Sequence, residues 1–456
     1  MRPEEIWQTI YDRFDPERAA GDPNLRVDRP TSPAMDVIQA LDRPRRTPKV
    51  LVTGTVGTGK TTELLRVAEA RGGKEIVVFL DLERHFSEVI RDAAALQRIT
   101  PWEVCFLAGL GLIAAFREQC AMSFSEEHLS SFVKAYADAA KRSETPRASE
   151  VDVGNIVKSL IQFTAGVAAL AASPVTAVGV TSVGGLLASV FGSIKWNVPI
   201  GRTKNELSDQ EREAQTMRDC VNVLVGMAQA QARRVLFIID GLDRVGDIER
   251  AKALFVDSQM IAEMDCPTVI CGPFALRHHP ATAAIRGFSD VLVLVNEPVL
   301  SQQDPSKHGP GVEFFCQLFQ RRTADLGTRE LVPRHLLEEL AYRSGGRARD
   351  FVRLIRVVAD EVLGANLEMA TEEIVHKALD KVRRQRETGL HKGHLRMLEE
   401  VAADQEHRLP EGPLAQELLR YGTLLPYPNE SEWYYPHPLL TMHLVKVPSS
   451  TPSGAN

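Results

Sequence analysis

Four residues close to the N-terminus have the types and spacing of a phosphate-binding loop. Gly54, Gly59, Lys60 and Thr61 fit the pattern G-x-x-x-x-G-K-[ST]. Glycines let the backbone turn tightly, so that successive N–H groups point into one concave anion site at a helix N-terminus. The lysine of such a loop reaches the β- and γ-phosphates, and the next hydroxyl ligates Mg²⁺. The pattern therefore predicts a nucleotide site made by Gly54, Thr55, Val56, Gly57, Thr58, Gly59, Lys60, Thr61 and Thr62.

The residues on either side of this loop supply the context that it needs. The apolar run Val50-Leu51-Val52 predicts a buried strand before it, and the residues after it predict an amphipathic helix that ends near Arg71. The alternative is a chance glycine turn between a strand and a helix, which the correct flanking context disfavours. The whole segment is therefore predicted to be a P-loop.

A second apolar strand ends in an acid. Val235–Ile239 is followed directly by Asp240. A buried strand can fix a carboxylate where it holds Mg²⁺ through water. Any buried strand can end in aspartate, but a position downstream of a P-loop favours the Walker B acid. We therefore predict that Thr61 and Asp240 are the metal-linked residues, and that Mg²⁺ accompanies the nucleotide.

The segment around this acid resembles a known group of ATPases. Residues 238–244, IIDGLDR, resemble the Walker B segment of STAND NTPases and the D-[DE]-L-D-R of KAP ATPases, both within the AAA+/STAND assemblage. The resemblance implies that Asp240 is the metal-linked acid and that Asp243 is a second acid that polarises the attacking water. A typical AAA+ protein has glutamate where this chain has Gly241, so the usual catalytic base is missing. Slow hydrolysis is the expectation.

A third segment resembles the lid of AAA+ proteins. Residues 344–351, SGGRARDF, resemble the S-G-G-x-x-R-x-h of the small helical lid, including that of the Cdc6/Orc-like branch. By this resemblance Arg349 is the sensor that reaches the γ-phosphate from the lid. The alternative is a solvated arginine at an ordinary helix N-terminus. The guanine signature N-K-x-D is missing at Asn296–Pro298, which makes ATP the expected nucleotide.

A long uncharged segment lies between the two nucleotide motifs. Residues 159–194 contain no charged side chain, but alanine, glycine, serine and threonine dominate and Pro174 divides the run. The pieces on either side of the proline are short or only marginally apolar for a membrane span. A packed or oligomer-facing insertion is the favoured interpretation, and membrane contact, as in KAP ATPases, is the alternative.

The C-terminal residues look like a winged helix. Helices are predicted up to residue 420, followed by a hairpin with its turn at 428–430. Many winged helices bind DNA, which requires Lys and Arg on the contacting surface. The candidate recognition helix, 412–420, holds one arginine and one glutamate, and the hairpin carries Glu430 and Glu432. Protein contact or self-association is therefore favoured over DNA.

Composition sets the broad class. The chain has 456 residues, 44% of them hydrophobic, and a formal net charge of −6, so an electrostatic coat of nucleic acid is not expected. The six cysteines lack metal-ligand spacing, and the N-terminal residues lack the apolar run of a signal peptide. We therefore predict a cytoplasmic protein with reduced thiols, with peripheral membrane association as the alternative.

Strands separated by helices, with the P-loop after the first strand, predict an α/β fold: a three-layer core around a parallel sheet, then a helical lid and a winged-helix-like end. The predicted function is a slowly hydrolysing, ATP-dependent conformational or assembly switch. The alternatives are a DNA-associated AAA+ ATPase, Cdc6/Orc-like or a transposition regulator, and a membrane-linked KAP-type ATPase. The predicted boundaries are an arm at 1–46, a core at 47–300 with its insertion at 158–202, a lid at 301–365, a winged-helix-like domain at 366–447 and a disordered tail at 448–456.

The P-loop assignment can be tested with one substitution. Lys60→Ala should abolish ATP binding, because the phosphates lose the only side-chain cation of the loop. Isothermal titration calorimetry measures this directly. An unchanged affinity in the variant would remove the basis of the assignment.

Overall fold

Five short strands form the parallel sheet that the sequence predicts. The first four are apolar runs that are buried over nearly their whole length, as expected for strands covered on both faces. Their bounds are β1 (Lys49–Thr53), β2 (Ile76–Asp81), β3 (Val235–Asp240), β4 (Thr268–Gly272) and β5 (Asp290–Val293). The order is β2-β3-β4-β1-β5, and all neighbouring strands are parallel. Their carboxyl ends therefore lie at one edge of the sheet.

The structure is a computed structural model. It describes residues 2–17, 21–29, 32–43, 47–89, 92–141, 207–327, 330–428 and 432–447. The described chain divides into two units, which we treat separately. The first contains residues 1–32, 55–62 and 294–456, and the second contains residues 33–54 and 63–293. The sheet belongs to the second unit.

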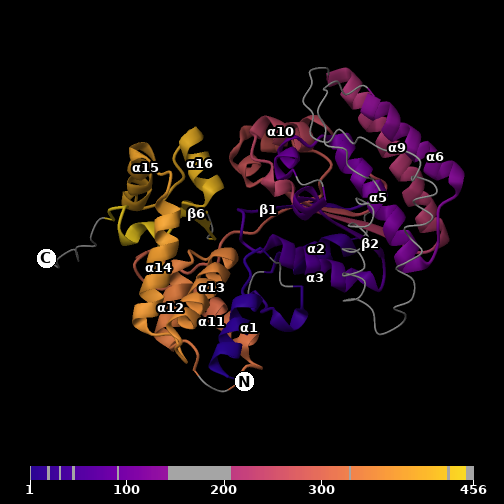
Figure 1. The fold of residues 1–456 in the computed structure, drawn as a ribbon. Helices are drawn as coiled ribbons and strands as arrows, with labels where there is room; N and C mark the ends of the chain where they lie inside the picture. The colour runs from indigo at the N-terminus through magenta and orange to yellow at the C-terminus, as the bar shows by residue number, and fades with distance from the viewer. Residues whose placement is uncertain are drawn as a thin grey trace. The chain divides into compact units, whose positions relative to one another are not determined.

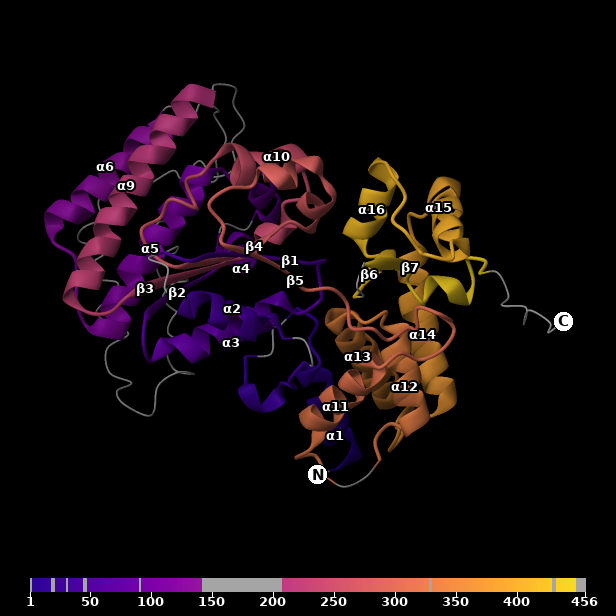
Figure 2. The ribbon, with the colours of Figure 1, turned by 180° about the vertical axis from the view of Figure 1, so that it is seen from behind.

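Helices cover both faces of the sheet (Figures 1 and 2). Strand residues alternate between two apolar clusters: Val78 and Phe237 pack on one face, Phe79 and Ile238 on the other. The first face is covered by α5 (Pro101–Cys120) and α9 (Leu207–Gln231), and α6 (Glu126–Lys141) packs on α9. The second is covered by α2 (Pro33–Asp42) and α3 (Lys60–Gly72). This is the predicted three-layer α/β core, and two short helices, α4 (Leu82–Arg84) and α10 (Ile248–Lys252), follow β2 and β3.

Two predicted segments lie outside the described residues: the apolar insertion at 158–202 with its uncharged run at 159–194, and the tail at 448–456. Among the residues that are described, no helix combines the length and apolarity that crossing a membrane requires.

The first unit is mainly helical. It contains α1 (Pro3–Arg13), α11 (Gly311–Thr323), α12 (Arg334–Arg343), α13 (Ala348–Ala365) and α14 (Glu372–Glu387). Although α1 begins the chain, it packs beside α11 and α13 (Figure 1). Trp7 of α1 is fully buried, and its indole N–H donates to the Glu368 carbonyl at 3.0 Å. The helical C-terminal part is thus completed by the first residues of the chain.

The last described elements follow the predicted order of helices and a hairpin. They are α15 (Lys392–Ala403), α16 (Pro413–Tyr421), β6 (Leu424–Tyr427) and β7 (Trp433–Pro436), and the two strands are antiparallel. Trp433 stacks on Tyr427 with ring centroids 4.8 Å apart, and both belong to the apolar cluster of the helices. These hairpin aromatics are therefore part of the core and do not form an exposed surface. A winged-helix domain remains a prediction.

Candidate nucleotide-binding site

The predicted P-loop turns sharply at two glycines. Gly57 has a φ of 91° and Gly59 a φ of 100°, values that favour glycine. Space is also restricted at both positions. A Cβ on Gly57 would lie 3.1 Å from the Cβ of Arg349, and a Cβ on Gly59 would lie 2.9 Å from Nη2 of Arg29. The two glycines are therefore required by backbone conformation and by close neighbours.

Side chains of the loop bind the carbonyl of Thr55. Nζ of Lys60 donates to the Thr55 carbonyl at 2.8 Å, and Oγ1 of Thr58 donates to the same oxygen at 3.0 Å. Lys60 is only 4% exposed. Thr61 and Thr62, on the first turn of α3, are half-buried.

The next three carbonyls are bound by residues far away in the sequence. The guanidinium of Arg347 donates twice to the Val56 carbonyl, from Nε at 3.2 Å and from Nη2. The backbone N–H of Arg349 donates to the Gly57 carbonyl at 3.0 Å, and Nη2 of Arg29 donates to the Thr58 carbonyl. The loop is therefore held through its carbonyl oxygens by an N-terminal residue and by the start of α13.

The backbone N–H groups of the same turn differ from its carbonyls in their hydrogen bonding. Within the described residues, no acceptor binds the backbone N–H of Val56, Gly57, Thr58 or Gly59. A turn whose carbonyls are bound and whose N–H groups are open is suited to anions, because the N–H dipoles are left for the ligand.

Several charged side chains also lie around the loop. Arg29 is paired with Glu297 at 3.4 Å, and Asp350 is paired with Arg347 and Arg386. Lys60 and these arginines are the residue types that bind phosphate groups.

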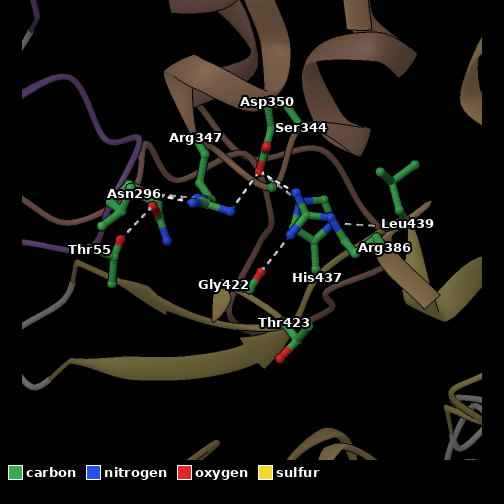
Figure 3. A network of polar contacts seen from close by, with 12 residues as sticks. Thr55, Asn296, Ser344, Arg347, Asp350, Arg386, Gly422, Thr423, His437 and Leu439 are labelled. Atoms are coloured by element: carbon green, nitrogen blue, oxygen red, sulfur yellow. Dashed lines mark hydrogen bonds and ion pairs between the residues drawn. The ribbon is translucent and has the colours of Figure 1, made fainter. Parts of the chain in front are cut away.

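Asp350 is the centre of the polar network that contains Arg347 (Figure 3). Its Oδ2 accepts from Nη1 of Arg347 at 2.9 Å, is paired with Nη2 of Arg386 at 2.8 Å, and lies 3.3 Å from Nε2 of His437. Burial acts to raise the pKa of Asp350, but the two arginines and His437 outweigh it and hold that pKa well below its usual range. Asp350 is therefore a carboxylate that balances two buried cations.

His437 is neutral in this network. Burial, and then the charge of Arg386, lower its pKa to about 3. Its Nδ1 accepts from the backbone N–H of Leu439 at 3.2 Å, so the ring proton is on Nε2 and points to Asp350.

The predicted acids lie in the other unit. Asp240 ends β3, is 4% exposed, and accepts the backbone N–H of Gly241 at 2.8 Å. One carboxylate oxygen of Asp240, one of Asp243 and the Cys271 sulfur all lie within 4.8 Å of one another. The two carboxylates suit Mg²⁺, which prefers oxygen ligands, and the thiol does not. The two carboxylates could therefore hold Mg²⁺, and Thr61 as a further ligand remains a prediction.

The absence of glutamate after Asp240 has a structural reason. Gly241 has a φ of 94°, and a Cβ there would be 2.7 Å from the backbone nitrogen of Glu83. A glutamate at this position would be strained in its backbone and would collide with α4.

Sequence reasoning missed two functional candidates. Asp81 ends β2 directly opposite Asp240, and burial and then the nearby Glu83 and Asp243 raise its pKa. Its signal was present, because IVVFLD repeats the pattern of an apolar strand ending in an acid. Arg347 is two residues before the predicted Arg349, and it is the guanidinium of Arg347 that binds the loop. The role predicted for the Arg349 side chain remains a prediction.

Comparison with known proteins gives no family assignment: no family model and no curated protein matches the chain. Similar solved structures include the Aeropyrum pernix ORC2 protein in its ADP form, with a TM-score of 0.41 and 15% identity over 94% of each chain. ORC1 of that organism, in complex with DNA, has a TM-score of 0.38 and 12% identity over 96% of each chain. The Thermotoga maritima RuvB Holliday junction branch migration motor has a TM-score of 0.27 and 15% identity over 52% of this chain and 83% of that chain. At TM-scores this low, the likeness does not bear on function.

The buried histidine makes a pH-dependent prediction. The pKa of His437 is about 3 when folded and near 6.5 when unfolded, so the unfolded chain binds the extra proton between these values. This stability contribution is complete above pH 6.5 and is lost as the pH falls towards 3. His437→Gln should make the free energy of unfolding less pH-dependent between about pH 6 and 4, by up to about 1.4 kcal/mol per pH unit.

Urea unfolding at several pH values measures this difference. His443→Gln is the matched control, because His443 is in the same segment with its side chain 69% exposed. If plots of the free energy of unfolding against pH are parallel for wild type and His437→Gln, the histidine is not held neutral by burial.

Proposed function

We propose that this chain is an ATP-binding P-loop ATPase of the AAA+/STAND kind, which hydrolyses ATP slowly and acts as a nucleotide-dependent conformational or assembly switch. The observation that carries the proposal is the P-loop turn, whose carbonyls are bound from elsewhere while four N–H groups are open.

Slow hydrolysis is supported by the residues near the Walker B acid. The position of the usual base is Gly241, where the backbone conformation and the contact with Glu83 disfavour a side chain. Asp243 is the predicted second acid beside Asp240, and it would orient or polarise the attacking water. Cys271, at the end of β4, is a poor hydrogen-bond donor for a phosphate. Such a site holds a nucleotide better than it turns one over.

A switch is supported by the way the loop is held. Arg29 and Arg347 come from segments that precede and follow the sheet in the sequence, and both bind loop carbonyls. A ligand changes a conformational equilibrium only through contacts that differ between the two states. Phosphates bound to the N–H groups of the turn would contact the same stretch of backbone whose carbonyls accept hydrogen bonds from Arg29 and Arg347. Arg349, at the same helix start, is our candidate for direct γ-phosphate contact.

The partner that would receive the signal is proposed to be a protein or a second copy of this chain. The charges on α16, Arg420 and Glu417, do not favour DNA, which needs a basic surface. A DNA-associated role and a membrane-linked role are the alternatives, and a salt-dependent mobility shift with duplex DNA and a vesicle flotation assay would reveal them.

Turnover and assembly test the proposal together. Wild type should release phosphate from ATP with Mg²⁺ at well below about 1 s⁻¹, the low end of typical enzymes. Asp243→Asn should lower that rate about tenfold or more, with ATP affinity retained, because it removes a candidate water-orienting acid. Asp257→Asn, at an exposed position of the same unit, is the matched control.

Light scattering and limited proteolysis of the same samples should distinguish ATP from ADP and from no nucleotide. Identical results in all three conditions would contradict the switch, and fast turnover by the wild type would show that the catalytic acid is wrongly assigned.

A further inference from the structure

A continuous line of buried polar contacts leaves the P-loop through Arg347. Two nitrogens of its guanidinium donate to the Val56 carbonyl, and the third, Nη1, donates to Asp350 at 2.9 Å. Arg347 and Asp350 are 6% and 4% exposed. Because one rigid, planar group makes both sets of bonds, a displacement of the loop at Val56 changes the geometry at Asp350.

From Asp350 the contacts reach the C-terminal hairpin by two routes (Figure 3). Arg386 of α14 is paired with Asp350 at 2.8 Å and donates from Nη1 to the Gly422 carbonyl at 2.9 Å. His437 lies 3.3 Å from Asp350 and donates its backbone N–H to the Thr423 carbonyl at 2.9 Å. The residues on both sides of β6 and β7 are therefore attached to the same carboxylate.

Two further contacts connect the P-loop with this hairpin. Oγ1 of Thr55 lies 3.4 Å from Oδ1 of Asn296, whose Nδ2 donates to the Pro426 carbonyl at 3.0 Å. Gly422 has a φ of 66°, and a Cβ there would be 2.3 Å from Nη1 of Arg347. The backbone at Gly422 thus packs directly on the guanidinium that holds the loop, with no space for an intervening side chain.

We propose that Arg347 and Asp350 are positioning residues that couple the P-loop to the described residues of the C-terminal hairpin and its flanks, 422–428 and 432–439. Nucleotide bound at the loop stabilises this segment, and disruption at the segment weakens nucleotide binding. The reciprocity follows from linkage, since one coupling free energy acts in both directions. The inference rests on the proposed nucleotide site and specifies which part of the chain responds to it.

The energetics support coupling through this network over independent motion. Hydrogen bonds between charged groups contribute more than neutral ones, and removal of one partner leaves a buried charge uncompensated. Asp350 is shared by Arg347, Arg386 and His437, so the loss of one contact changes the field at the others. The contacts are therefore not additive, and non-additivity is what a coupled element requires.

The test uses two arginines of one helix. Arg386 has a side chain that is 10% exposed and contacts Asp350, whereas Arg384, two residues away on α14, is 74% exposed and pairs with Asp380. Arg386→Gln should weaken ATP binding about tenfold, equivalent to about 1.4 kcal/mol, although the residue makes no contact with residues 55–62 within the described structure. Arg384→Gln should leave the affinity unchanged.

Hydrogen exchange measures the ATP-dependent protection of this segment, which the loss of a residue with a purely structural role would not change. In the wild type, ATP should slow exchange at residues 422–428 and 432–439, and in Arg386→Gln this ATP-dependent change should disappear. His437→Gln is the second variant in case Arg386→Gln does not fold, because glutamine keeps a neutral donor near Asp350. It should reduce the ATP-dependent change without abolishing folding.

The outcomes separate the coupling from the nucleotide site. The coupling is overturned if Arg386→Gln and His437→Gln show the same ATP affinity and the same ATP-dependent protection as Arg384→Gln. A wild type that binds no ATP overturns the proposed function. Exchange at residues 55–62 without nucleotide then decides the coupling by itself: faster exchange in Arg386→Gln supports it, and unchanged exchange overturns it.

Discussion

The hydrogen bonding of one turn is the constraint on which the candidate site depends. The side chains of this turn bind its Thr55 carbonyl, whereas the carbonyls of Val56, Gly57 and Thr58 are bound by residues that the chain brings from its N-terminal part and from the start of α13. The carbonyls of the turn therefore bind protein groups, and its N–H groups are left for an anion. The glycines at 57 and 59 are required because these partners approach so closely.

The same constraint explains why charged residues are buried in the first unit. Arg347 can reach the loop only from a buried position, and a buried guanidinium needs a carboxylate. Asp350 fills that role, but it also serves Arg386 and His437, and through them the backbone at Gly422 and Thr423. The ion pairing that Arg347 needs beside the P-loop therefore also involves residues next to the C-terminal hairpin. This is the physical basis of the proposed coupling.

Local patterns predicted much of the fold. The strand before the P-loop, the helix after it and the strand that ends in Asp240 depend on short-range spacing, and the structure has each of them close to its predicted bounds. Contacts between distant residues were not predictable in the same way. Nothing in the spacing of Arg29, Arg347 or His437 indicates that they converge, because that depends on packing of the whole helical unit. Gly241 is intermediate: the sequence shows a glycine where glutamate is usual, but the structural reason, the close approach of α4, required coordinates.

The central claim is that the open N–H groups of the P-loop bind nucleotide phosphates, and hydrogen exchange at Val56, Gly57, Thr58 and Gly59 tests it most directly. Without nucleotide these amides should exchange rapidly, because no described residue accepts their hydrogen bonds. With saturating ATP and Mg²⁺ their exchange should slow by about tenfold or more, since phosphate oxygens become their acceptors. Exchange at these four amides that is the same with and without ATP would contradict the account.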